Sequence, residues 1–465
     1  MPKFLTVFIM FILAAPVHGL DLPSSQIADD SLLRIKLKDA WFTESPARVL
    51  AQRAVIQYLE SGERVEVRAE EQREEFMVIL SRELYSGRAE NTGRDNGRSF
   101  TRTGTGQFPG WAQGSWILTR RKDTGESISI RIFPRSDQYA YIQFRPFSAV
   151  KKVDDKCLMD VVVYGGYLVN SMPIGVGFER LYTMQLNDIL KLAGNRFPRR
   201  YFDPDPENYR EHRKLIAQVR EQIKELNYAD DGAIDEHGEY VYIKTLNRQN
   251  PEVKGLNCSG FTKWLVDGLL RPVTGERLPI PPLREPFGQR GSSFTENWEE
   301  RRDVFFGLDW IRNLAAEANG TLRSEAYRVL DEFEVRSEII SSVMVRTNRG
   351  FASHSYPGFF KEAGFGIEGL RPLLYALAID EPYQFYLAAV NTEISTPANE
   401  NPFGTPRLRQ YFHVAALIPY FDEFGSFRIA VFESADETSF NSFRARYPGH
   451  HVNLVSIPVS AKFEP

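Results

Sequence analysis

The segment from Gly255 to Trp264, Gly-Leu-Asn-Cys-Ser-Gly-Phe-Thr-Lys-Trp, constrains the fold more than any other part of the chain. Its apolar residues recur at the spacing of one face of an α-helix over 260–270, at Phe261, Trp264, Leu265 and Leu269. We expect Pro272 to end this helix. Cys258 then lies at the helix N-terminus, where unpaired N–H groups and the helix dipole stabilise a thiolate. The sequence therefore predicts a reactive cysteine.

The chain has only two cysteines, Cys157 and Cys258. In an oxidising compartment two cysteines favour a single disulfide, which would make Cys258 a structural residue. A chain of 465 residues can bury a large core without such a bridge. Both interpretations stay open at the level of the sequence.

A nucleophilic cysteine needs a base, and His413 is the best candidate. It begins a predicted strand to Tyr420, which turns at Asp422-Glu-Phe-Gly425 and returns as a second strand to Glu433. A three-residue loop would place Glu433 opposite His413, where its carboxylate could accept the imidazole Nδ1–H. A slip by one residue would bring Ser434 there instead.

The other histidines fit a base less well. His212 lies on a charged helix and is expected to be exposed, and His354 lies in a turn-like segment. The adjacent pair His450 and His451 follows Tyr-Pro-Gly in a turn, and neighbouring histidines rarely bind one metal ion. We expect no metal and no cofactor. The acidic turn 230–237 lacks the spacing of a calcium loop.

The residues Asn257-Cys-Ser-Gly-Phe-Thr-Lys-Trp264, together with the His413 hairpin, resemble the NlpC family of cell-wall cysteine peptidases, which have a papain-like fold. The resemblance implies that Cys258 is the nucleophile, His413 the base and Glu433 the group that orients it. First-turn N–H groups, including that of Ser259, would bind the oxyanion. The family's tyrosine near this position would correspond to Tyr240, with Tyr242 as the alternative.

The sequence favours an α+β protein of several regions. A basic residue, an apolar run and a small residue indicate a signal peptide over 1–19. We predict a helical region with a flexible loop over 20–114, including a charged helix from Arg68 to Tyr85, and a β-rich domain with helices over 115–230. A papain-like domain would span 231–465, with a mainly helical insertion over 271–380.

A net charge of −4 gives no basis for nucleic-acid binding, and no segment after the signal is apolar enough to span a membrane. The sequence predicts a secreted or periplasmic cysteine hydrolase that cleaves amide bonds, in peptidoglycan peptides by the resemblance. Two alternatives remain. One is a papain-like amidase or acyltransferase with a non-wall substrate, and the other is an exported binding protein with a Cys157–Cys258 disulfide.

Overall fold

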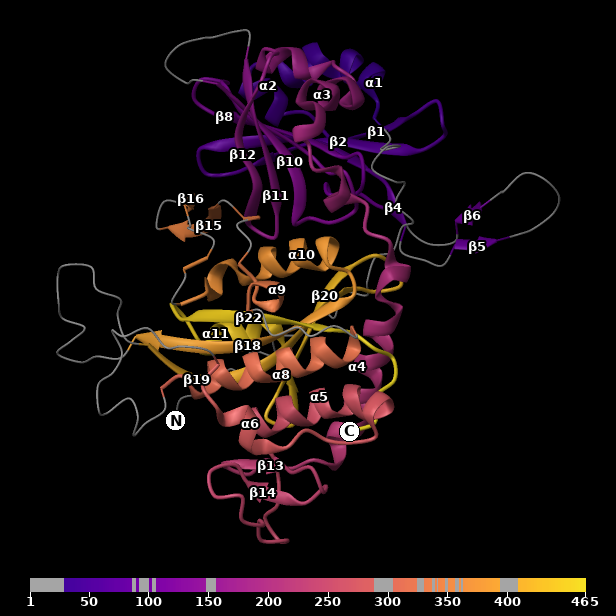
Figure 1. Cartoon of the computed structure of the whole chain (residues 1–465). Helices are drawn as coiled ribbons and strands as arrows, with labels where there is room; N and C mark the ends of the chain where they lie inside the picture. Colours follow the sequence, from indigo (N-terminus) through magenta and orange to yellow (C-terminus); the bar gives the residue numbers. More distant parts are fainter. Residues whose placement is uncertain are drawn as a thin grey trace, which may run out of the picture. The chain divides into compact units, whose positions relative to one another are not determined.

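We describe a computed structural model of the chain, shown in Figure 1. It describes residues 29–85, 89–91, 100–102, 106–147, 156–287, 304–323, 330–336, 339–340, 342–347, 350–355, 359–360, 363–393 and 409–465. The predicted signal peptide lies outside these residues. The chain divides into two compact units, one of residues 1–159 and 173–197, the other of residues 160–172 and 198–465. No helix of the described residues is long and apolar enough to cross a membrane.

The first unit is built on an antiparallel sheet with short helices. Its strands pair in the order β1 (Val55–Tyr58), β2 (Arg64–Glu71), β3 (Glu75–Arg82), β8 (Trp116–Arg121), β9 (Ser127–Ile132) and β10 (Ala140–Pro146). Its helices include α1 (Ser31–Leu37), α2 (Pro46–Leu50) and α3 (Leu186–Ala193). The strands predicted at 115–119, 127–133 and 139–144 are thereby confirmed.

The predicted helix from Arg68 to Tyr85 is wrong, because this segment forms parts of β2 and β3. Alternate residues are buried in β2 and at the start of β3, namely Val65, Val67, Phe76 and Val78, and β3 is then buried throughout from Val78 to Arg82. Alternate burial belongs to a strand with one face in the core, whereas the charged residues of the segment suggest a helix. Because β3 pairs with β8, the predicted division at residue 114 falls inside one sheet.

The loop predicted before residue 114 contains short strand pairs. β4 (Leu84–Tyr85) pairs with β7 (Gly106–Gln107), and β5 (Ala89–Asn91) pairs with β6 (Phe100–Arg102). The strands β11 (Cys157–Val163) and β12 (Gly166–Ile174) each contain residues assigned to both units. The sequence predicted the first of these strands and missed the second.

The second unit holds a six-stranded sheet between helices (Figure 1). The strand order is β17 (Phe365–Gly366), β22 (His451–Pro458), β18 (Gln384–Glu393), β19 (Arg409–Phe421), β20 (Phe427–Glu433) and β21 (Asp436–Thr438). Helices α5 (Cys258–Thr274) and α8 (Phe306–Leu322) cover one face, and α10 (Leu370–Asp380) lies on the other. The α+β class and the four long strands are as predicted.

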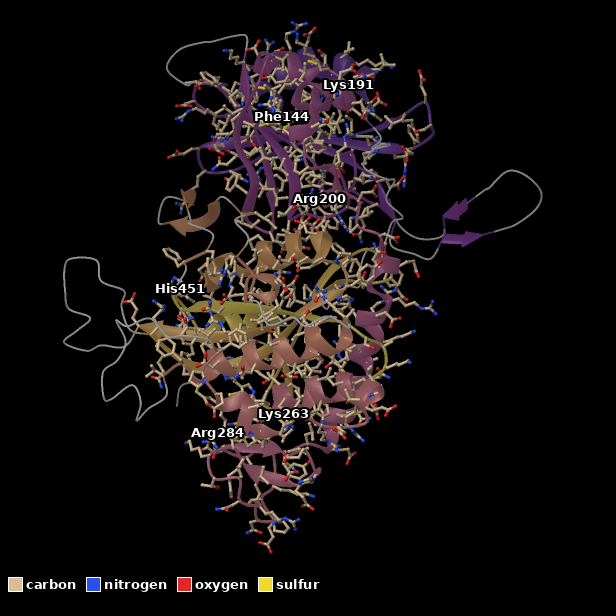
Figure 2. All side chains as sticks on the ribbon, viewed as in Figure 1. Phe144, Lys191, Arg200, Lys263, Arg284 and His451 are labelled. Carbon is tan, nitrogen blue, oxygen red and sulfur yellow. The ribbon has the colours of Figure 1, made fainter. Side chains whose placement is uncertain are left out.

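The core of this unit lies between its sheet and helices α5 and α8, where side chains fill the space (Figure 2). Trp310 of α8 is fully buried, and its Nε1 donates to the Ser259 carbonyl of α5 at 2.9 Å. Part of the predicted insertion over 271–380 is therefore core. The described residues of that region are mainly helical, as predicted, in α6 (Ile280–Arg284), α8, α9 (Leu330–Phe333) and α10. They also form strands that the sequence did not predict, β15 (Ser342–Thr347), β16 (Gly350–Ser355) and β17.

The cysteine helix does not end at Pro272, as the sequence suggested, but continues to Thr274 and is closed by Gly275 at φ 78°. A proline cannot donate to the carbonyl four residues earlier, which here is that of Gly268. The Gly268 carbonyl instead accepts from the Glu464 N–H at 2.7 Å. Another stretch of chain thus supplies the missing bond, and the helix tolerates the proline.

Phe463 anchors this stretch, because its ring packs against Trp264 at 5.3 Å and would meet any Cβ at Gly268 within 2.3 Å. We expect Phe463→Ala to lower the free energy of unfolding by about 3 kcal/mol, as for other buried aromatic residues. Urea unfolding measures the change. Glu464→Ala is the matched control, since it keeps the backbone bond to Gly268. Equal stability of the two variants would contradict the anchoring role.

Candidate active site

The N-terminus of helix α5 is fixed by close backbone packing. Asn257 caps the helix, its Oδ1 accepting from the Gly260 N–H at 2.8 Å, and its own N–H donates to the Gly232 carbonyl at 3.0 Å. A Cβ at Gly260 would lie 2.0 Å from that same carbonyl oxygen of β13 (Gly232–Ile234). Gly260 is therefore needed so that the start of the helix can approach β13. This geometry sets the position of Cys258.

Cys258 is a free, partly buried thiol. Burial acts to raise its pKa, but a hydrogen bond from the His413 side chain and the charge of His413 act in the opposite direction. Hydrogen bonds to the Val414 backbone and to the Ser259 side chain add to the lowering. The net effect is a pKa below the ordinary value of a cysteine, which favours the thiolate.

His413 contacts Glu433 as the sequence predicted, but through the other ring nitrogen. The His413 Nε2 lies 2.6 Å from Glu433 Oε2. We had expected Nδ1 at that place. With Nε2 directed at the carboxylate, Nδ1 is the nitrogen left for the thiol of Cys258. A carboxylate on one imidazole nitrogen fixes the tautomer and the ring orientation.

The hairpin that carries this pair has a different register from the expected one. Phe421 pairs with Phe427, so the loop has five residues, and Gly425 adopts the positive φ of 76° that its position suggested. Asp422 Oδ1 accepts from the Ser426 N–H and closes the longer loop. The register differs from the predicted one by two residues. Because side chains alternate with a period of two, Glu433 stays on the face of His413.

Ser434, the alternative partner of His413, does not lie on the strand. Ser434 and Ala435 have φ of 49° and 64° and form the turn between β20 and β21. Glu433 itself is 5% exposed. Glu433 of β20, and not Ser434, therefore contacts the His413 imidazole.

Two further residues complete the surroundings of His413, and the sequence analysis missed both. Arg446, the last residue of α11 (Phe440–Arg446), donates to Glu433 Oε1. The Tyr447 ring lies 5.6 Å from the His413 ring. Ser439 caps this helix through the Ser442 N–H, and that serine was the available sequence signal for a helix start here. Nothing local showed that the helix would return to His413.

The resemblance implied Tyr240 beside the oxyanion, but the electrostatic interaction with Cys258 is made by another tyrosine, Tyr228. Tyr240 of β14 (Tyr240–Tyr242) lies under the Lys254 ammonium, 5.0 Å from the ring centre. Tyr228 interacts electrostatically with Cys258 and forms a bridge with Leu256, two residues before the cysteine. It is 62% exposed. Tyr228 is thus a better candidate than Tyr240 for a substrate contact.

The first turn of α5 can also receive an oxyanion. Ser259 is buried, its Oγ lies 4.0 Å from the Cys258 Sγ, and its carbonyl is occupied by Trp310. Asn257 Oδ1 accepts a hydrogen bond from the Gly260 N–H. The N–H groups of Cys258 and Ser259, in contrast, have no acceptor within the described part of the chain. They are available to a substrate oxygen.

The remaining histidines have other environments. His212 is fully buried rather than exposed, with Nε2 3.0 Å from the Gln384 carbonyl, and burial lowers its pKa to about 4. His354 lies in β16, not in a turn. Burial and Arg409 lower the pKa of His451 to about 4. Within the described ranges, no group of three metal-ligating side chains is present.

The alternative of a Cys157–Cys258 disulfide is not borne out, because both cysteines are free. Cys157 is fully buried in β11, and burial raises the pKa of its thiol to about 12. The environments of the two thiols therefore shift their pKa values in opposite directions, and the shift at Cys258 favours the reactive thiolate.

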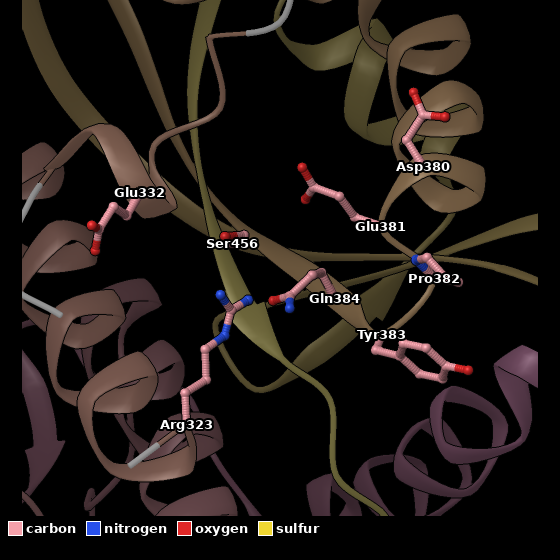
Figure 3. A pocket seen from close by; sticks show the side chains of 8 residues that line it. All are labelled: Arg323, Glu332, Asp380, Glu381, Pro382, Tyr383, Gln384 and Ser456. Atoms are coloured by element: carbon pink, nitrogen blue, oxygen red, sulfur yellow. The ribbon is translucent and has the colours of Figure 1, made fainter. Parts of the chain in front are cut away.

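A pocket of about 360 Å³ lies elsewhere in the second unit (Figure 3). It is lined by Arg323, Glu332, Asp380, Glu381, Pro382, Tyr383, Gln384 and Ser456. Gln384 begins β18, whereas His413 pairs with Val390 near the other end of that strand. The pocket is separate from Cys258.

Comparison with known proteins finds a family match for the first unit and for residues 160–172 and 198–201 of the second. A family model described as a domain of unknown function, DUF8515, matches residues 23–201. The match ends before Cys258, His413 and Glu433. No curated protein and no solved structure matches the chain. The chemistry of the candidate site rests on its own geometry.

Proposed function

We propose that the second unit is a cysteine hydrolase that cleaves amide bonds. The observation that carries the proposal is the alignment of Cys258, His413 and Glu433 at the N-terminus of α5. A thiolate with lowered pKa, an imidazole beside it and a carboxylate behind the imidazole are the groups that nucleophilic acyl transfer requires.

In the proposed reaction the Cys258 thiolate attacks the substrate carbonyl carbon, and the N–H groups of Cys258 and Ser259 bind the oxyanion. His413 gives the Nδ1 proton to the leaving amine as the C–N bond breaks, which leaves a thioester on Cys258. Neutral His413 then takes a proton from water, and the hydroxide released in this way attacks the thioester. The acid product leaves, and the thiolate and imidazolium are restored.

For the substrate we propose peptides of peptidoglycan, and for the location the periplasm or the exterior. The support is the resemblance of the Cys258 and His413 segments to the NlpC family and the signal-like N-terminus. Acyl transfer to an acceptor other than water would use the same thioester, so the products distinguish the two reactions.

The test is incubation of the purified protein with peptidoglycan, followed by counting of new amino termini and mass analysis of released peptides. We expect release by the wild type and by Cys157→Ala, and none by Cys258→Ala. Equal release by Cys258→Ala would contradict the nucleophile. Release from simple peptide amides but not from peptidoglycan would contradict only the substrate.

A further inference from the structure

Glu433 is shared between two cationic partners. Its Oε2 contacts His413 Nε2 at 2.6 Å, and its Oε1 accepts from the Arg446 guanidinium. The Glu433 side chain is 6% exposed, whereas that of Arg446 is 47% exposed. A buried carboxylate with one partner on each oxygen cannot rotate without losing a charge-assisted hydrogen bond. Arg446 therefore fixes the orientation in which Glu433 meets the imidazole.

The residue after Arg446 holds the imidazole from another side. The Tyr447 ring lies 5.6 Å from the His413 ring at an interplanar angle of 30°, and the Arg446 guanidinium lies 5.5 Å from the centre of the Tyr447 ring. Phe443, one turn earlier in α11, packs against Tyr447 at 5.3 Å. The end of α11 thus contacts both the carboxylate and the ring that it orients.

We propose that Arg446 is a positioning residue of the candidate site, which holds Glu433 so that His413 keeps its second nitrogen directed at Cys258. The inference rests on the proposed function. It adds a fourth member to the arrangement, in the order Arg446, Glu433, His413, Cys258. Arg446 has no part in bond making, and its effect reaches the thiol through the orientation of the imidazole.

The groups that face this arrangement come from several elements. The charged and titratable ones are Cys258 and Tyr228 on the side of α5, and Glu433, Arg446 and Tyr447 on the side of the hairpin and α11. Asp230 acts on Tyr228, and His450 packs against Tyr447. When Arg446 is removed, Glu433 and His413 gain rotational freedom and the hydrogen bond to the thiol weakens. The weaker hydrogen bond disfavours the thiolate while His413 is protonated.

The test is the pH dependence of Cys258 alkylation by iodoacetamide, followed by mass spectrometry in the full chain. For Arg446→Met we expect the midpoint to rise by about 0.5 to 1 pH unit. Arg446→Lys keeps the charge without the forked geometry, so it should restore part of the shift. Arg444→Met is the matched control, since Arg444 is on the same helix but pairs with Glu368 at 3.7 Å.

Thermal unfolding of each variant accompanies the titration, because a purely structural role would lower stability without moving the midpoint. An unchanged midpoint in Arg446→Met would overturn the proposal, and so would an equal shift in Arg444→Met. If wild-type Cys258 shows no thiolate near neutral pH, the proposed function itself fails. Failure of the positioning role of Arg446 and failure of the proposed function therefore give different results.

Discussion

Replacing His413 by alanine is expected to slow the alkylation of Cys258 at about pH 7 by tenfold or more. The thiol is partly buried, and burial by itself raises its pKa. In the wild type the hydrogen bond and charge of His413, together with the hydrogen bonds of the Val414 backbone and the Ser259 side chain, outweigh that effect. Without the imidazole the burial remains, so the pKa of Cys258 should rise above that of an ordinary cysteine. Hydrolysis should fall further, by about 10²–10⁴-fold, because the general acid is also lost.

The matched control is His450→Ala. His450 lies near the same aromatic residues, 5.7 Å from the Phe412 ring and 5.9 Å from the Tyr447 ring, but it makes no contact with Glu433 among the described residues. We expect it to keep the alkylation rate within about twofold of the wild type. Comparable loss in both variants would show that the effect comes from disturbed packing rather than from the base.

The second large effect concerns stability and arises inside the cysteine helix. Lys263 and Asp267 form an ion pair at 2.6 Å with side chains 0% and 1% exposed, and Figure 2 labels Lys263 within the second unit. Asp267 Oδ1 also accepts from the Leu278 N–H at 2.9 Å. Burial lowers the pKa of Lys263 and raises that of Asp267. Removing one partner leaves the other charge buried alone.

For Asp267→Ala we therefore expect a loss of about 3–5 kcal/mol in the free energy of unfolding, measured with urea. The double variant Lys263→Met with Asp267→Leu should recover most of that loss, because it removes both charges and keeps the volume. Glu221→Ala breaks an exposed pair with Lys224 and should change stability by less than about 0.5 kcal/mol. An Asp267→Ala variant as stable as Glu221→Ala would contradict this account.

The elements that carry the candidate site could be predicted because their signals are local. The apolar spacing after Cys258 gives helix α5, and a glycine between two β-rich runs gives the hairpin of His413. Glu433 was found by counting across that hairpin. The register was wrong by two residues, yet the residue was right, since a shift of two keeps the face.

What the sequence did not reveal depends on contacts between distant segments. Arg446 reaches Glu433 only because α11 folds back along β20, and Tyr228 meets Cys258 only through its bridge to Leu256. The sequence predicts a helix end at Pro272, and this is wrong because the Glu464 N–H, which bonds the Gly268 carbonyl in place of the proline, comes from a distant part of the sequence. The predicted helix over Arg68–Tyr85 is wrong because its charged residues suggest a solvated helix face, whereas the segment forms the end of β2 and the largely buried β3.

The central claim is that Cys258 is an activated nucleophile, and the two cysteines of the wild-type chain provide a direct test. Both are exposed to iodoacetamide over a range of pH, and mass spectrometry follows each labelled peptide. We predict rapid labelling of Cys258 at about pH 7 with little further gain at higher pH, while buried Cys157 stays unlabelled until the chain is unfolded. Labelling of Cys258 that rises about tenfold per pH unit up to pH 8, as for an ordinary thiol, would contradict the claim.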